Sequence, residues 1–173
     1  MTPEENEPDR DHDRIEVEYI KSKVFQYGSE FGWRIEEENE DDDGWQGLFS
    51  CEFEEEGSPH SEMLFVNKPL GAPYVKFEFW LPIEPMFFKS RVKEIIGIIS
   101  DFGLCLSLDE DLNDPEKLVL QISIRVFVSN YNVETFEYVT ENLFACKDAL
   151  LEYFEEQEWR SDMRKSGEPP NRS

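Results

Sequence analysis

Apolar and polar residues alternate along much of the middle of the chain. The alternation is clearest from Lys117 to Val128, where every second residue is apolar and most residues between are polar. A strand that buries only one of its faces has this pattern. Five further strands are predicted, which begin near Trp33 and cover residues 49–54, 63–66, 74–81 and 104–109. The run 63–66 is short and apolar and alternates too little to assign its faces. The acidic run from Glu36 to Gly44 is interpreted as the connection between the first two strands, because Asp-Gly is a common hairpin turn.

Three other segments have the spacing of amphipathic helices. Apolar residues recur every three or four positions within residues 20–31, 88–102 and 136–154. Asp11 or Asp13 is expected to cap the first helix and Gly32 to end it, while Pro85 suits the start of the second.

The predicted order is helix, four strands, helix, two strands, helix. Short turns rich in glycine and proline favour antiparallel neighbours, and the helices can cover one apolar face. The sequence therefore predicts an α+β protein: a two-layer fold with a mostly antiparallel sheet of about six strands and three helices. Residues 13–159 are expected to form one domain. Residues 1–12 and 160–173 are polar and contain proline, so they are predicted to be disordered tails.

Charge narrows the range of partners. The chain has 40 acidic and 17 basic residues, a formal charge of -23. Nucleic acids and anionic membranes require clustered cations, so neither is an expected partner. The charge fits an acidic solvated surface or a basic partner.

Three dispersed cysteines, Cys51, Cys105 and Cys146, favour a reducing compartment. The N-terminus does not resemble a signal peptide, and no apolar window approaches the ~18 residues of a spanning helix, so a cytoplasmic location is expected.

Two patterns resemble metal sites but lack the chemistry such sites need. Asp109-x-Asp111-x-Asn113 begins like a calcium loop, but the sixth position is Asp114 rather than glycine and the twelfth is Leu120 rather than glutamate. An acidic turn explains it better. His60 lies among glutamates, yet one histidine in a flexible turn does not fix a coordination geometry.

No pattern indicates catalysis. Neither histidine lies in a rigid element beside a nucleophile, and the sequence has no glycine-rich phosphate loop. We therefore predict no catalytic, metal-binding or cofactor-binding residues and expect no cofactor. The chain is not expected to be an enzyme, although a site assembled from distant residues remains the alternative.

The outward face of the sheet offers the candidate binding residues. Tyr74, Trp80, Val119 and Phe127 are large apolar residues on strand faces that are otherwise polar. Apolar residues in such positions can mark a surface for a partner. The alternative is that a tail or the first helix covers them within the same chain.

The order of elements resembles the fold of type III secretion chaperones and of related bacterial sensory-transduction regulators. The resemblance rests on whole elements between Asp13 and Trp159, not on a motif. This chain has four predicted strands between its first two helices, where those chaperones typically have three. No family binding residue has a matching motif here. The resemblance implies a chaperone-like or regulatory homodimer that binds polypeptides.

These observations favour a non-catalytic, acidic protein that binds another polypeptide, for which a basic one is an option, and forms a homodimer. The first alternative is an acidic inhibitor or immunity protein for a basic partner, and the second is an enzyme. Salt-sensitive association would favour the inhibitor. A pocket with converging polar groups would favour the enzyme.

Overall fold

A single six-stranded antiparallel sheet forms one layer of the molecule. The computed structural model describes residues 7–55, 58–111 and 113–166. The strand order is β1-β2-β3-β4-β6-β5, and every neighbouring pair is antiparallel. The elements in chain order are α1 (Glu7–Glu30), β1 (Trp33–Asp41), β2 (Gly44–Glu55), β3 (Ser58–Pro69), β4 (Tyr74–Ile83), α2 (Pro85–Asp101), β5 (Cys105–Glu110), β6 (Leu118–Phe127), the short 3-10 helix η1 (Val128–Asn130) and α3 (Val133–Ser166). The predicted fold class and element order are confirmed.

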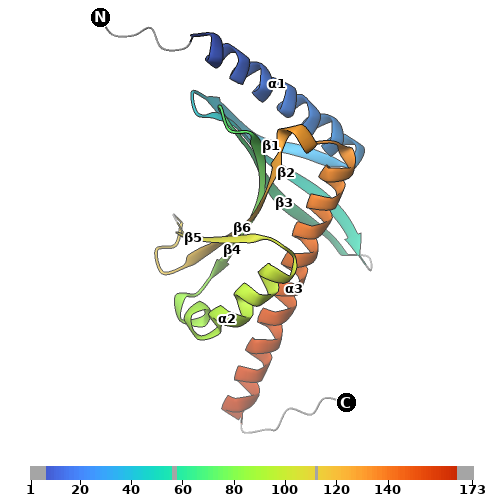
Figure 1. Cartoon of the computed structure of the whole chain (residues 1–173). Helices are drawn as coiled ribbons and strands as arrows, with labels where there is room; N and C mark the ends of the chain where they lie inside the picture. The colour runs from blue at the N-terminus through green and yellow to red at the C-terminus, as the bar shows by residue number, and fades with distance from the viewer. Residues whose placement is uncertain (1–6, 56–57, 112, 167–173) are drawn as a thin grey trace, which may run out of the picture.

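The helices form the second layer and cover one face of the sheet (Figure 1). α1 packs on β1, β2 and β3, α3 crosses β4 and β6, and α2 contacts β5 and α3. The buried residues of the strands alternate as the sequence predicts, with Val75, Phe77, Phe79 and Leu81 turned towards the helices. The core lies between the two layers.

Aromatic rings join α1 and α3 to the sheet at one end of this core. Phe136 of α3 lies 5.9 Å from both Tyr27 of α1 and Phe77 of β4, measured between ring centroids. Phe25 of α1 lies 5.6 Å from Phe49 of β2. These contacts fix both helices on the same face of the sheet.

The acidic run is strand rather than connection, so the prediction for Glu36–Gly44 is wrong. β1 pairs with β2 as far as Asp41, and only two residues form the turn before Gly44. Lys21 of α1 compensates two of the acids, with its Nζ 3.7 Å from Glu38 and 3.2 Å from Glu40. A cation from a distant element therefore allows an acidic segment to pair as an edge strand.

Both long helices extend beyond their predicted ends. α1 begins at Glu7, so Asp11 and Asp13 lie inside the helix and do not cap it. The third helix is predicted to end at Trp159, where the domain was expected to end, but α3 continues to Ser166. Polar residues occur both in solvated helices and in coil, so the polar composition of these segments led to predicted helices that are too short. Residues 1–6 and 167–173, the outer parts of the predicted tails, lie outside the described residues.

Candidate functional site

The sheet face opposite the helices carries the four candidate binding residues. We call this surface, formed by the alternate strand residues that point away from the helices, the open sheet face. Trp80 is 40% exposed and Phe127 is 60% exposed, whereas Tyr74 is half-buried and Val119 is only 9% exposed. The described helices lie on the other side of the sheet (Figure 1), and the exposed fractions of Trp80 and Phe127 show that neither ring is fully covered.

The four residues lie at two ends of the open sheet face. Tyr74 pairs with Phe127 across β4 and β6, and Val119 pairs with Pro82 near the other end of the same strands. Trp80 lies six residues along β4 from Tyr74, about 20 Å at the usual strand rise. The structure therefore brings Tyr74 and Phe127 together and places Trp80 and Val119 apart from them.

An aromatic pair dominates the second end. The rings of Trp80 and Phe65 stack with centroids 4.1 Å apart and an interplanar angle of 20°. The Trp80 indole Nε1–H donates to Glu78 Oε1 at 3.1 Å, which fixes the plane of the ring. Phe65 also lines a depression of about 160 Å³ on β1 and β2, together with Leu48 and Gln46. The sequence missed Phe65 because the short apolar run from Met63 to Val66 has no clear alternation.

Charged side chains separate the two ends. Lys76 Nζ lies 2.9 Å from Glu78 Oε2, and Glu78 is buried despite its place on the open face. The Arg125 guanidinium lies 4.7 Å from the Tyr74 ring centroid, within cation–π range. The open sheet face therefore has two apolar patches about 20 Å apart with a polar centre between them.

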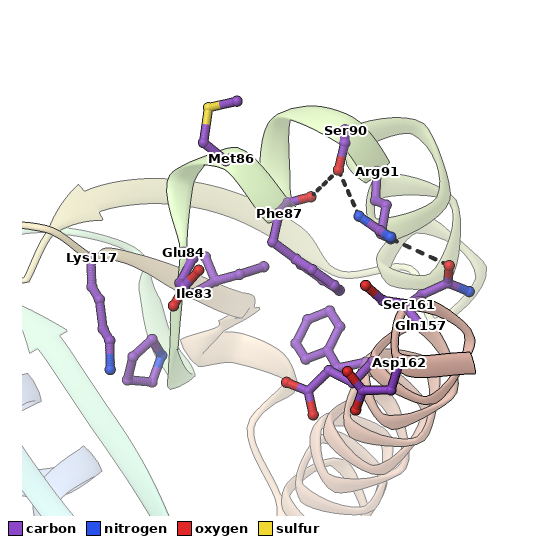
Figure 2. A pocket seen from close by; sticks show the side chains of 13 residues that line it. Ile83, Glu84, Met86, Phe87, Ser90, Arg91, Lys117, Gln157, Ser161 and Asp162 are labelled. Atoms are coloured by element: carbon purple, nitrogen blue, oxygen red, sulfur yellow. Dashed lines mark hydrogen bonds between the residues drawn. The ribbon is translucent and has the colours of Figure 1, made fainter. Parts of the chain in front are cut away.

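A second concave surface lies where α3 projects past the sheet. We call it the α2–α3 groove; it has a volume of about 730 Å³. Figure 2 shows Phe87 and Arg91 of α2 facing Gln157 and Asp162 of α3 across it. The end of β4 and Lys117 close the remaining side.

Aromatic and polar contacts join the walls of the α2–α3 groove. The Phe87 and Phe154 rings meet edge to face, with centroids 5.5 Å apart. The Arg91 guanidinium lies 4.4 Å from the Phe87 ring centroid and donates from Nε to Gln157 Oε1 at 3.3 Å. Arg91 also has non-helical backbone angles, φ -133° and ψ 20°, so α2 bends where this side chain reaches α3.

The sequence did not predict this groove. Its walls come from segments about seventy residues apart, and two of its lining residues, Ser161 and Asp162, lie beyond the predicted end of the third helix at Trp159. The available signal was local: Met86 and Phe87 follow the proline that opens α2, ahead of the apolar stripe that begins at Phe88.

The remaining candidate residues lie in different surroundings within the described part of the chain. Burial raises the pKa of the Cys146 thiol to about 12 and also raises that of Cys51, so both thiols are protonated at neutral pH. Cys105 is exposed on the open sheet face. His12 is exposed on α1, and the side chain of His60 lies outside the described part of the structure. The described residues contain no group of three or more potential metal ligands.

The calcium-like segment forms turns instead of a metal loop where it is described. The backbone N–H of Asn113 donates to Asp111 Oδ1 at 2.9 Å, and that of Glu116 donates to Asp114 Oδ1 at 3.1 Å. Asp109 is already part of β5. Two of these carboxylates therefore cap local backbone groups, as aspartates in turns often do.

Comparisons with known proteins give a fold but no function. No protein-family model matches the chain, and neither does any curated protein. The crystal structure of an uncharacterized protein from Methanothermobacter thermautotrophicus is similar, with a TM-score of 0.60 and 14% sequence identity. The match covers 82% of this chain and 98% of that protein. At this identity the likeness concerns the fold alone. Among the described helices, none is both long and apolar enough to cross a membrane.

Proposed function

We propose that this protein is a non-catalytic, acidic polypeptide-binding protein with a chaperone-like or regulatory role, and that it binds its partner on the open sheet face. The observation that carries the proposal is the exposed aromatic surface of this face. Trp80 and Phe127 are exposed on the sheet face opposite the one that the described helices cover. Exposed rings that are rimmed by polar groups are typical of protein interfaces.

The geometry favours an extended or helical segment as the ligand. A segment about 20 Å long can contact the Tyr74–Phe127 end and the Phe65–Trp80 end together, while the Lys76–Glu78 pair meets polar groups between them. A helix of that length has about 13 residues. A second copy of this chain is one possible source of the segment, as in the predicted homodimer.

Site-specific crosslinking tests the proposal. A photoreactive phenylalanine analogue replaces Phe127 in the full chain, and irradiation in an extract of its own cells is expected to attach a polypeptide. The control places the analogue at Tyr138, which is 63% exposed on α3. The added substitution Trp80→Ser is expected to lower the yield at position 127.

The outcomes separate the possible partners. An adduct of twice the chain's mass indicates a homodimer, and any other polypeptide adduct is then identified and reconstituted with purified components. Equal labelling at positions 127 and 138, or no adduct at 127, contradicts the proposal.

The acidic edge of the sheet favours one second candidate, an inhibitor of a basic protein. Seven of the eight residues from Glu36 to Asp43 are acidic, and most of them lie on the edge strand β1. Such an inhibitor associates by electrostatic steering, so its association rate constant falls steeply with salt. A partner identified by crosslinking that is neutral, or that binds at a salt-independent rate, excludes this candidate.

A further inference from the structure

We propose that the α2–α3 groove is a second docking site, and that it takes a polypeptide segment in which a lysine or arginine stands beside an apolar residue. The inference rests on the proposed polypeptide-binding function but uses a different surface. The groove lies at the far end of α3, on the helix side of the sheet (Figures 1 and 2).

The apolar part of the groove is available to a ligand. Phe87 and Phe154 form an aromatic wall, and Met86 on the rim is 74% exposed. A flexible methionine beside two rings can pack against many apolar side chains, which suits a peptide anchor. In Figure 2 the Phe87 ring points into the groove from α2.

The charges of the groove select a cationic ligand. Three lining carboxylates, those of Glu84, Glu158 and Asp162, form no ion pair within the described part of the chain. On the opposite side of the groove, Lys117 Nζ lies 3.8 Å from Asp114 Oδ2. Lys117 is therefore paired with Asp114 and not with any of these three carboxylates. The carboxylates are therefore free to bind a lysine or arginine whose aliphatic stem packs on the rings.

The chain itself shows how this surface holds a cation. The Arg91 guanidinium packs against the Phe87 ring and donates to Gln157, without a carboxylate partner in the described structure. A partner cation placed nearer Glu158 and Asp162 gains the same kind of aromatic contact together with opposite charge.

Binding of designed peptides to the full chain tests the site. The probe is a fluorescein-labelled, 14-residue amphipathic peptide of leucine and lysine, and anisotropy measures its dissociation constant. Two matched peptides replace leucine by serine or lysine by glutamate. The leucine–lysine peptide is expected to bind at least tenfold more tightly than either, a difference of about 1.4 kcal/mol.

Variants locate the binding. Glu158→Gln combined with Asp162→Asn is expected to weaken binding about tenfold, since it removes two charges that contact the ligand. Glu137→Gln combined with Glu141→Gln changes the same net charge at exposed sites elsewhere on α3, so at most a twofold effect is expected. Met86→Ser is expected to weaken binding several-fold, and Tyr138→Ser, also exposed, is its control.

Three other outcomes would overturn the proposal. Equal weakening by the two double variants shows diffuse attraction to an acidic surface and overturns the site. Loss of binding in Trp80→Ser but not in the groove variants also overturns it, while the open sheet face keeps its proposed function. If no peptide binds below about 100 µM, a weak affinity even for a short segment, the groove proposal fails regardless of the crosslinking result.

Discussion

At the residue scale, Tyr131 stands out among the described core residues because its side chain lacks a hydrogen bond. Its buried hydroxyl has no hydrogen-bond partner among the described residues. Burial in this apolar setting also raises the pKa of Tyr131 above its ordinary value. An unpaired buried hydroxyl costs about 1–3 kcal/mol relative to a paired or solvated one. Tyr131→Phe is therefore expected to raise the free energy of unfolding by about 1 kcal/mol at pH 7.

The same substitution has a predictable pH dependence. Because the pKa is raised in the folded protein, the stability linked to Tyr131 is present below the ordinary tyrosine pKa of about 10 and is lost as the pH rises above it. The gain in unfolding free energy from Tyr131→Phe should thus be larger at pH 10.5 than at pH 7 in urea titrations. Exposed Tyr138→Phe is the matched control. A variant less stable than the parent would mean that the hydroxyl is hydrogen-bonded in solution.

Lys147 is a second residue that is expected to stabilise the fold, through an ion pair. Its Nζ contacts the Glu62 carboxylate across the interface of α3 with β3, and both side chains are largely buried. Lys147→Met removes this ion pair from a largely buried site, so a loss of about 2–3 kcal/mol is expected in urea unfolding. Lys89→Met, at an exposed lysine of α2, should change stability by no more than about 0.5 kcal/mol. Equal effects would show that solvent screens the ion pair.

At the element scale, the turn between β1 and β2 depends on Gly44. Its φ of +130° lies in a region that side chains rarely adopt, and a Cβ there would meet the Lys68 carbonyl oxygen at 2.3 Å. Gly44→Ala is therefore expected to lower the melting temperature by several degrees, a cost of at least about 2 kcal/mol. Gly97→Ala is the control, because a Cβ at this helical site meets nothing within 4 Å. It should stabilise α2 by about 0.5–1 kcal/mol; the opposite order of the two variants would contradict the turn geometry.

The elements also show what local pattern can and cannot predict. β4 and β6 follow from alternation because one of their faces is buried under helices, and α3 follows from its apolar stripe. The start of β1 at Trp33 was predicted, but its acidic continuation was not, since two of its acids, Glu38 and Glu40, pair with Lys21 from α1, which no local window contains. For the candidate site, alternation placed Trp80 and Phe127 on the exposed face, but it also included Val119, which is only 9% exposed. The α2–α3 groove depends on where two helices meet, so only the tertiary structure reveals it.

At the scale of the whole molecule, a formal charge of -23 means that the acidic side chains repel one another on balance, which destabilises the compact folded state. Salt screens repulsion between exposed charges over about 10 Å at 0.1 M. The melting temperature is therefore expected to rise by a few degrees between 10 and 300 mM NaCl, while binding of a basic partner weakens over the same range. Two charge reversals test the cause. Glu37→Lys on β1 should raise the melting temperature at low salt by about 1–2 °C, and Lys89→Glu should lower it by a similar amount. Both differences should nearly vanish at 300 mM NaCl; if they persist, local contacts rather than the field of the whole protein set the effect.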